Sequence, residues 1–408
     1  MTVVSEFLAA TLVPAGQVGR RLALAALIDS FGSGMFLTAS AIYFTTVVGL
    51  SATQVGLGLS VAGFAGLLGS VPLGMLGDRV GSGRVYVALQ LWRALGYVAY
   101  PLVGGFGGFV VVATAIEVGD AALPAIAQTV VGQAVGDADR VTTLAKVRAV
   151  RNLGFGLGAA VAAGVLAIGS RPAFLALVLV NAAAILVSAL LLHRAGITAL
   201  RTVAVSSQRF EPVRDGAYLA VTLLNGVLSI HMTLLFVGLP LWLSGHTDVP
   251  VPLFGGLVVI NTVLAVTLQA RFAERTNQPA GAIACMVRAG LALAGFAVLA
   301  ELLGRIHLTS VAVVLAVLAV VLLTCGELWQ SAGGWAISYQ LAPPGRQARY
   351  LATFQLGTAV QMMAAPAIVV GLVFPHGFGW LGLALVTTAA GFLVRPAVRA
   401  AGPGVAQV

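Results

Sequence analysis

Long apolar segments separated by short polar loops run along almost the whole chain. A helix needs about 20 mostly apolar residues to cross the hydrocarbon layer of a bilayer, and twelve segments of this chain meet that condition. The pattern therefore predicts an all-α polytopic membrane protein with twelve transmembrane helices. We expect these helices near residues 22–48, 54–75, 84–103, 108–135, 144–168, 172–192, 215–243, 252–270, 279–302, 308–340, 347–373 and 378–395.

Basic residues are distributed unevenly between the loops. If the N-terminus is inside, eighteen arginine and lysine residues fall in cytoplasmic segments, and only Arg171 and Arg305 fall in external loops. Cytoplasmic loops of membrane proteins accumulate Lys and Arg. The bias therefore predicts that both termini are cytoplasmic.

The longest polar stretch divides the chain near its midpoint. We interpret it as a cytoplasmic linker between two helical bundles. The expected organisation is an N-terminal tail, a six-helix bundle, the linker, a second six-helix bundle and a C-terminal tail, at residues 1–19, 20–193, 194–214, 215–396 and 397–408.

The two predicted bundles also resemble each other in sequence. Gly74–Arg79 and Ala270–Arg275 both follow a small/x/apolar/small/acid/Arg pattern, at an offset of 196 residues. The same offset places Asp29 of the first span over Asn225 of the seventh. Repeats of this kind are a known plan of transporters, with the binding site between the halves near the middle of the bilayer. The bundles are therefore predicted to be pseudo-symmetric.

Composition and charge agree with a membrane protein. The chain is 59% hydrophobic and 9% charged, whereas soluble domains are about a quarter charged. A net charge of +9 would suit nucleic-acid binding only if the basic residues shared one face. They lie in separate loops instead, so nucleic-acid binding is excluded. The two cysteines, Cys285 and Cys325, lie in apolar segments and suggest packing rather than a metal site.

Two motifs resemble those of the major facilitator superfamily, and the resemblance covers nearly the whole chain. The first is Gly74–Arg84, between spans two and three, which matches the family's loop signature except for a reduced basic end. The second comprises Gly326 and Glu327 in span ten, followed by Leu341–Arg346 and Tyr350. It is similar to the drug:proton antiporter branch of the family.

Two positions depart from that branch. Its members usually have an arginine in span four, where this chain has Ala115. The glycine-rich signature of span five is present at Gly154–Ala159 but lacks its proline. The resemblance therefore implies a transporter, and it supports proton-driven export less strongly.

The resemblance also implies a conformational role for the loop after span two. In the family this loop stabilises the outward-facing state by pairing across the two halves. The candidate partners of Asp78 are Arg140, Arg346 and Arg349. The alternative is a simple orientation signal. The residues assigned to this gate loop are Gly74, Gly77, Asp78, Arg79 and Arg84.

Ionisable side chains at bilayer depth are costly and are candidates for function. In span four, Glu117, Asp120 and Gln128 lie along one helical face, with Pro124 predicted to bend the helix. Such a polar stripe must face the protein interior or a water-filled cavity. The residues predicted to line a cavity for protons or substrate are Asp29, Glu117, Asp120, Gln128, Asn225, Glu327, Gln330 and Gln355.

A second interpretation of these acids remains open. They could pair with Arg93 or Arg288, the basic residues well inside spans, and hold helices together. His231 lies on a different side of span seven from Asn225, so we expect it to form hydrogen bonds within the core.

The sequence excludes ATP-driven transport and disfavours an enzyme. The only lysine, Lys146, does not follow the glycine-rich loop that cradles phosphate, and neither a nucleophile with its base nor a metal set stands out. We therefore expect a secondary active transporter without a cofactor, which exports apolar or cationic small molecules in exchange for protons. The alternatives are uptake of a small metabolite by symport or facilitated diffusion, and a non-transporting sensor on the same fold.

The expected partners are a small-molecule substrate, protons and the lipid bilayer. A single lysine beside twenty-one arginines suggests a GC-rich bacterial genome and hence a plasma membrane. The resemblance implies a monomer.

Overall fold

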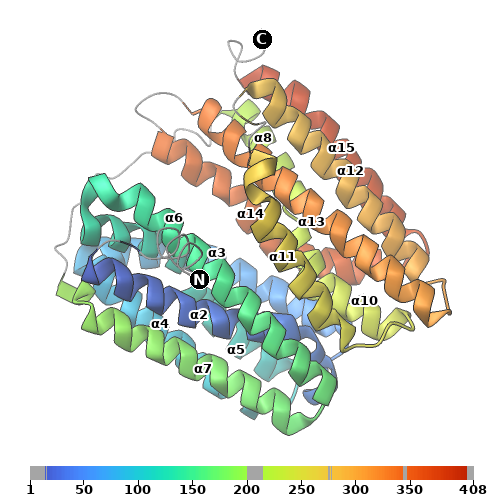
Figure 1. Cartoon of the computed structure of the whole chain (residues 1–408), viewed down its shortest axis with the longest axis horizontal. Helices are drawn as coiled ribbons and strands as arrows, with labels where there is room; N and C mark the ends of the chain where they lie inside the picture. The colour runs from blue at the N-terminus through green and yellow to red at the C-terminus, as the bar shows by residue number, and fades with distance from the viewer. Residues whose placement is uncertain are drawn as a thin grey trace, which may run out of the picture. The chain divides into compact units, whose positions relative to one another are not determined.

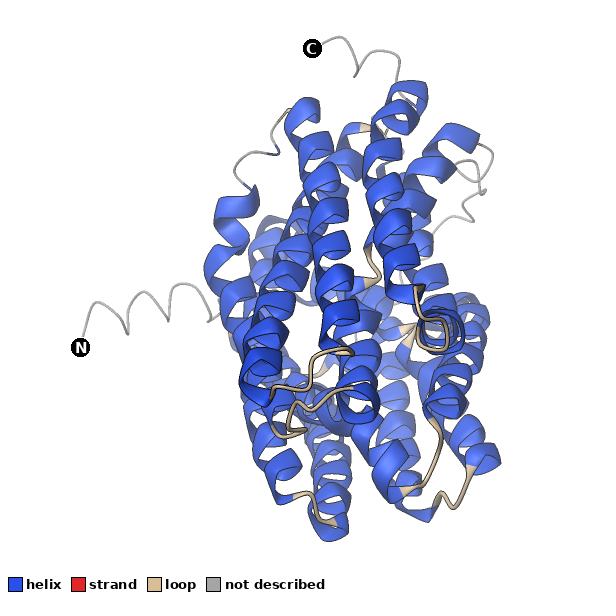
Figure 2. Cartoon of the chain, turned by 90° about the vertical axis from the view of Figure 1, so that its right-hand side faces the viewer, coloured by secondary structure: helices blue, strands red, loops and turns tan. Residues whose placement is uncertain are grey.

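The computed structural model describes residues 14, 16–199, 215–273, 276, 278–342 and 347–401. Within these ranges only the backbone is described for residues 78, 136–142, 145, 270, 273, 279, 347–349 and 352. All regular secondary structure in the described ranges is helical (Figure 2). The predicted all-α fold is therefore confirmed.

The chain forms two compact units, the first of which comprises Met1–Ser206. Its helices lie alongside one another in a bundle, blue to green in Figure 1. In chain order they are α2 (Gln17–Ile42), η1 (Tyr43–Val47), α3 (Ala52–Val80), α4 (Ser82–Ala99), η2 (Tyr100–Leu102), α5 (Phe106–Asp120), α6 (Leu123–Ile168), α7 (Arg171–Arg194) and η3 (Ile197–Ala199).

The second unit comprises Ser207–Val408. It is a bundle of the same kind, yellow-green to red in Figure 1. Its helices are α8 (Gly216–Leu228), α9 (His231–Thr233), η5 (Leu234–Gly238), α10 (Leu239–His246), α11 (Leu253–Ala273), α12 (Pro279–Leu303), α13 (Thr309–Gln340), α14 (Gln347–Ile368), η7 (Val369–Val373) and α15 (Gly379–Ala401).

Ten helical stretches in the described ranges are long and apolar enough to cross a membrane. Two further helices complete the set of twelve. The apolar part of α11 is shorter, Leu253–Gln269, and α4 is less apolar because it carries Arg84, Gln90 and Arg93. Each unit therefore supplies six membrane helices, as the hydropathy pattern predicts.

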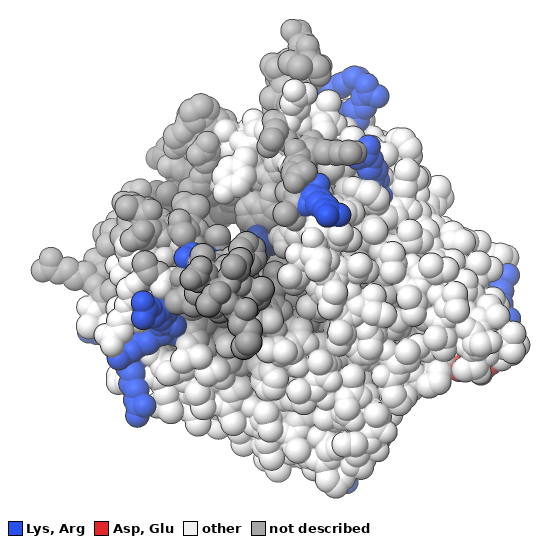
Figure 3. Space-filling model, in the orientation of Figure 1, with Lys and Arg blue, Asp and Glu red and all other residues white. Residues whose placement is uncertain are grey.

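The outer surface is largely apolar. Leu102, Val111, Phe378 and Leu385 are among the exposed large hydrophobic side chains, and charged side chains are sparse on the face shown in Figure 3. A soluble protein rarely exposes so large an apolar area. The surface is suited to contact with lipid.

Span four differs in detail from the prediction. Its helix is interrupted at residues 121–122, between α5 and α6, and Pro124 lies in the first turn of α6. Proline lacks the backbone N–H that a continuous helix would use. The helix is therefore interrupted just before the proline, and the bend itself stays a prediction.

The expected loop between spans four and five is helical instead. α6 continues as one hydrogen-bonded helix from Leu123 to Ile168. A straight helix of that length would measure about 69 Å, more than twice the hydrocarbon layer. Two separate candidate membrane spans lie along it, one ending at Val135 and the next beginning at Lys146, and Leu144 packs against the buried cluster that contains Val130 and Val131.

Glycines allow the closest helix contacts in each unit. A Cβ atom added at Gly158 of α6 would lie 2.0 Å from the Phe31 carbonyl oxygen of α2. In the second unit, a Cβ at Gly357 of α14 would lie 2.1 Å from the Thr222 carbonyl oxygen of α8. Small residues let membrane helices approach in this way. The abundant glycine therefore has a packing role at these positions.

Span seven is interrupted near its middle. The α-helix stops at Leu228, Ser229 and Ile230 form a turn, and a π-helix follows at Leu234–Gly238. Broken helices often carry binding residues in transporters, and π-helical turns are frequent at functional sites. The side chains around this break are described below.

Candidate functional site

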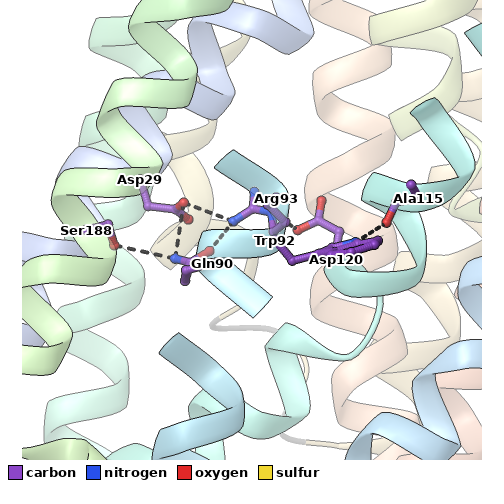
Figure 4. A network of polar contacts seen from close by, with 7 residues as sticks. All are labelled: Asp29, Gln90, Trp92, Arg93, Ala115, Asp120 and Ser188. Atoms are coloured by element: carbon purple, nitrogen blue, oxygen red, sulfur yellow. Dashed lines mark hydrogen bonds and ion pairs between the residues drawn. The ribbon is translucent and has the colours of Figure 1, made fainter. Parts of the chain in front are cut away.

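Arg93 lies at the centre of a charged cluster in the first unit. Its side chain is 4% exposed and comes from α4. Nη1 lies 3.1 Å from Asp29 Oδ1 of α2, and Nε lies 2.9 Å from Asp120 Oδ1 of α5 (Figure 4). The Nε contact is an ion pair without the alignment of a hydrogen bond. One guanidinium therefore connects two carboxylates from different helices.

Gln90, one turn before Arg93, fixes the cluster to neighbouring helices. Its Oε1 accepts a hydrogen bond from Arg93 Nη1. Its Nε2 lies 3.4 Å from both Asp29 Oδ1 and Ser188 Oγ of α7. Gln90 is 1% exposed, so its amide cannot exchange these partners for water without a rearrangement.

The cluster has an excess of negative charge. One guanidinium faces two carboxylates, so the net charge is −1 when both acids are ionised. Asp29 is 19% exposed and Asp120 is 39% exposed. Asp120 is therefore the member of the cluster that a proton or a cation can reach most easily.

Glu117 lies one turn before Asp120 on α5 and packs against α3. A Cβ atom added at Gly66 would lie 2.9 Å from Glu117 Cγ, so only glycine leaves room for this side chain. Among the described residues, no hydrogen bond or ion pair is formed by the Glu117 carboxyl group. The predicted acids Asp29, Glu117 and Asp120 thus belong to one region, but only two of them are paired.

The second unit has a neutral cluster around the break in span seven. Gln330 Nε2 of α13 donates to Asn225 Oδ1 at 2.8 Å and to Ser229 Oγ at 3.1 Å. His231 Nε2 lies 3.2 Å from Gln330 Oε1. Ser229 also lies 3.5 Å from the Thr358 hydroxyl group of α14. The hydrogen bonding predicted for His231 within the core is therefore confirmed.

The charged and neutral clusters occupy equivalent places in the two units. Asp29 and Asn225 are related by the offset of 196 residues. On the fourth helix of each unit the offset is 210 residues, because Ile116 packs on Gly96 as Gly326 packs on Leu293. That offset relates Asp120 to Gln330.

The same comparison explains why the second cluster needs no arginine. The counterpart of Arg93 is Ala289 at the offset of 196 residues, or Gly290 at the offset of 197 that relates Gly96 to Leu293, and both are small buried residues. With this small residue in place, Asn225 and Gln330 contact each other directly. The same site thus holds Asp–Arg–Asp in one unit and two amides in the other.

Glu327 is the counterpart of Glu117 at the offset of 210 residues. Its Oε2 accepts a hydrogen bond from Asn261 Nδ2 of α11 at 2.9 Å. Asn261 Nδ2 also lies 3.0 Å from Thr324 Oγ1. In both units, therefore, an acid on the fourth helix faces the second helix.

Two predicted cavity residues lie outside both clusters. Gln128 and Gln355 are exposed and have no side-chain hydrogen bond within the described ranges. Their role in a cavity stays a prediction.

Part of the predicted gate loop is helical. Gly74 and Gly77 lie in the last turns of α3, which ends at Val80 before Gly81 (φ 107°). Arg84 Nε donates to the Thr198 carbonyl oxygen at 3.2 Å, within the same unit.

Other gate-loop predictions are untested. Arg79 is exposed. The side chains of Asp78, Arg140 and Arg349, and all of Arg346, lie outside the described residues. The predicted pairing across the halves therefore stays a prediction.

The sequence interpretation did not assign Gln90, Ser188 or Asn261 to a site. Each is a single polar residue in an apolar span, and this isolation is the feature of the sequence that could have identified them as candidates. Arg93 was considered only as a structural partner of the acids, and the structure shows that it pairs with two of them.

Comparisons with solved structures show the same fold. The nucleoside transporter NupG shares 16% identity with a TM-score of 0.70, covering 94% of this chain and 99% of that chain. A POT family transporter in complex with 5-aminolevulinic acid shares 15% identity with a TM-score of 0.74, covering 95% and 98%. A bacterial homologue of the iron transporter ferroportin, in an inward-facing state, shares 15% identity with a TM-score of 0.66, covering 93% and 97%.

No curated protein matches the sequence significantly. The family model described as Major Facilitator Superfamily matches residues 22–366. That range contains the charged cluster, the amide cluster and the gate loop. The chain therefore belongs to the Major Facilitator Superfamily and has the fold of a membrane transporter, not of an enzyme.

Proposed function

We propose that the protein is a secondary active transporter that exports cationic or apolar small molecules in exchange for protons. The observation that carries the proposal is the excess of carboxylate over guanidinium in the cluster of Asp29, Arg93 and Asp120. The transport cycle is alternating access, in a bacterial plasma membrane with both termini in the cytoplasm. The working unit is a monomer without a cofactor.

The charge balance of the cluster supports exchange. Arg93 compensates one of the two paired carboxylates, and an ionised Glu117 beside them raises the excess negative charge from one to two. A proton on Glu117 reduces this excess, and so does a substrate cation near Asp120. Because both ligands relieve the same unfavourable charge, each weakens the binding of the other, and this coupling is reciprocal.

The unequal partners of the acids support a division of roles. Asp29 and Asp120 each form an ion pair with Arg93. Glu117 forms no ion pair or hydrogen bond among the described residues. Glu117 therefore carries the exchanged proton, and Asp120 binds the positive group of the substrate.

Purified protein in proteoliposomes tests the proposal. We expect an imposed pH gradient to drive export of the lipophilic cation tetraphenylphosphonium. Glu117→Gln and Asp120→Asn should each reduce this pH-driven export at least about tenfold, which corresponds to about 1.4 kcal/mol. Glu301→Gln is the matched control, because Glu301 pairs with Arg305 outside the cluster.

Two results would contradict the proposal. One is full pH-driven transport by both cluster variants. The other is transport of the probe by the wild-type protein at a rate that does not respond to the pH gradient.

Uptake of small metabolites is the second candidate function. The arrangement of Arg93 between two carboxylates could bind a zwitterion, with its acidic group near the guanidinium and its amine near Asp120. Proton-driven accumulation of a labelled dipeptide or nucleoside, without export of the cation, would favour this alternative.

A further inference from the structure

We propose that Glu327 is a second proton-binding site, so that each transport cycle carries two protons, one on Glu117 and one on Glu327. The inference rests on the proposed function, because it assumes that Glu117 carries the first proton.

The positions of the two acids support this inference. Glu117 packs against Gly66 of α3, and Glu327 bonds Asn261 of α11. Gly66 corresponds to Thr262 at the offset of 196 residues, which is the neighbour of Asn261. The two carboxyl groups therefore lie at the same level of equivalent helix pairs.

The surroundings of Glu327 differ from those of the paired aspartates. Glu327 is partly buried, and its one side-chain partner in the described ranges is the neutral amide of Asn261. Burial disfavours a carboxylate unless an opposite charge compensates it. Glu327 thus has only a neutral partner, whereas Asp29 and Asp120 each form an ion pair with Arg93.

No nearby charge replaces the missing cation. Nine described titratable groups besides Glu327 lie on α13 or on helices packed against it, and Glu327 forms no ion pair or hydrogen bond with any of them. Among them, His231 bonds Gln330 instead, and Arg271 and Arg288 are exposed. The nine groups are Tyr218, His231, Arg271, Cys285, Arg288, Glu301, Cys325, Tyr339 and Tyr350, and Glu301 pairs with Arg305.

Asn261 suits both protonation states of Glu327. Its Nδ2 group can donate to a carboxylate oxygen or to the carbonyl oxygen of a neutral carboxyl group. A guanidinium would instead favour only the ionised form. In the proposed step, the Glu327 carboxylate takes one proton from the outside and releases the same proton to the inside, with no other bond formed or broken.

Charge movement gives a direct test. With tetraphenylphosphonium as the probe, two protons entering for one cation leaving move one net positive charge inward. We therefore expect wild-type export in proteoliposomes to respond to both the pH gradient and the membrane potential. Glu327→Gln should change the ratio from two protons per cation to one, so that export responds to the pH gradient alone.

Two variants serve as controls. Glu327→Asp keeps a carboxyl group and should retain the ratio of two. Glu301→Gln removes a carboxyl group that pairs with Arg305 and should also retain it. A ratio of two in Glu327→Gln would overturn the inference.

Chemical labelling decides the case if Glu327→Gln does not transport. Dicyclohexylcarbodiimide reacts with protonated carboxyl groups in apolar surroundings, and mass spectrometry locates the adduct. We expect labelling of Glu327 in the wild-type protein that decreases as the pH rises. Absence of a Glu327 adduct at every pH would overturn the inference. Failure of the wild-type protein to export the probe would count against the proposed function, whereas this labelling would still test the proton site.

Discussion

The comparison of the two units provides a substitution experiment within one chain. Arg93→Ala places in the first unit the small residue that the second unit has at Ala289. On its own this change leaves Asp29 and Asp120 without their guanidinium. The triple variant that adds Asp29→Asn and Asp120→Gln reproduces the amide arrangement of the second unit.

The structure sets the expected size of these effects. Removing one partner of a buried ion pair costs about 3–5 kcal/mol, whereas neutral replacement of the whole set is often tolerated. Because Asp120 is 39% exposed, we take the lower end, about 3 kcal/mol. For a unit of this size, that loss lowers the Tm by about 6–12 °C. The triple variant should recover at least half of the loss but remain without pH-driven transport.

Thermal unfolding of the purified protein in one detergent measures the stability. Transport of tetraphenylphosphonium in proteoliposomes measures the coupling. A second single variant, Asp29→Asn, keeps Arg93 paired with Asp120 and should lose less stability than Arg93→Ala.

The reasoning would be refuted if Arg93→Ala left the Tm unchanged, since the guanidinium would then not hold the two helices together. It would also be refuted if the triple variant kept pH-driven export, because the charged cluster would then be dispensable for coupling.

Three further predictions follow from other parts of the structure. Gly158→Ala should cost about 1–3 kcal/mol and lower the Tm, because the new Cβ would meet the backbone of α2, whereas Gly164→Ala on the same helix has open space and should not. Gln90→Leu should cost about 1–3 kcal/mol by leaving buried groups unpaired, compared in the same unfolding assay with Gln128→Leu at an exposed position. Asp78→Asn should shift the protein towards the inward-facing state, and unchanged two-sided accessibility labelling would count against the gate-loop prediction.

The apolar pattern was sufficient to predict the twelve helices, because a membrane span needs a fixed length of apolar residues. It did not predict the continuity of α6 from Leu123 to Ile168. Polar residues lower hydropathy without preventing a helix, so a drop in hydropathy marks the end of a span and not the end of the helix.

The candidate site was predictable only in part. Asp29, Glu117 and Asp120 were conspicuous because charge is rare in apolar spans. The bridging by Arg93 depends on how three helices pack, which a linear pattern does not contain. Asn261 was missed because a neutral amide is a weak signal beside a charge.

The structural correspondence between Glu117 and Glu327 could not be predicted from the sequence for a different reason. A single offset of 196 residues describes the first helices of each unit, but the fourth helices follow an offset of 210. Only contacts between helices reveal that shift.

The unbroken α6 has a mechanical consequence. A flexible loop between spans four and five would absorb movement, but a hydrogen-bonded helix transmits it. Asp120 ends α5, and the interruption at residues 121–122 is the only break before Ile168. If a ligand pulls Asp120 away from Arg93, the displacement is absorbed at that two-residue joint or passed on to the glycine contacts with α2. Stiffening the joint should therefore slow turnover without changing how tightly the ligand is held.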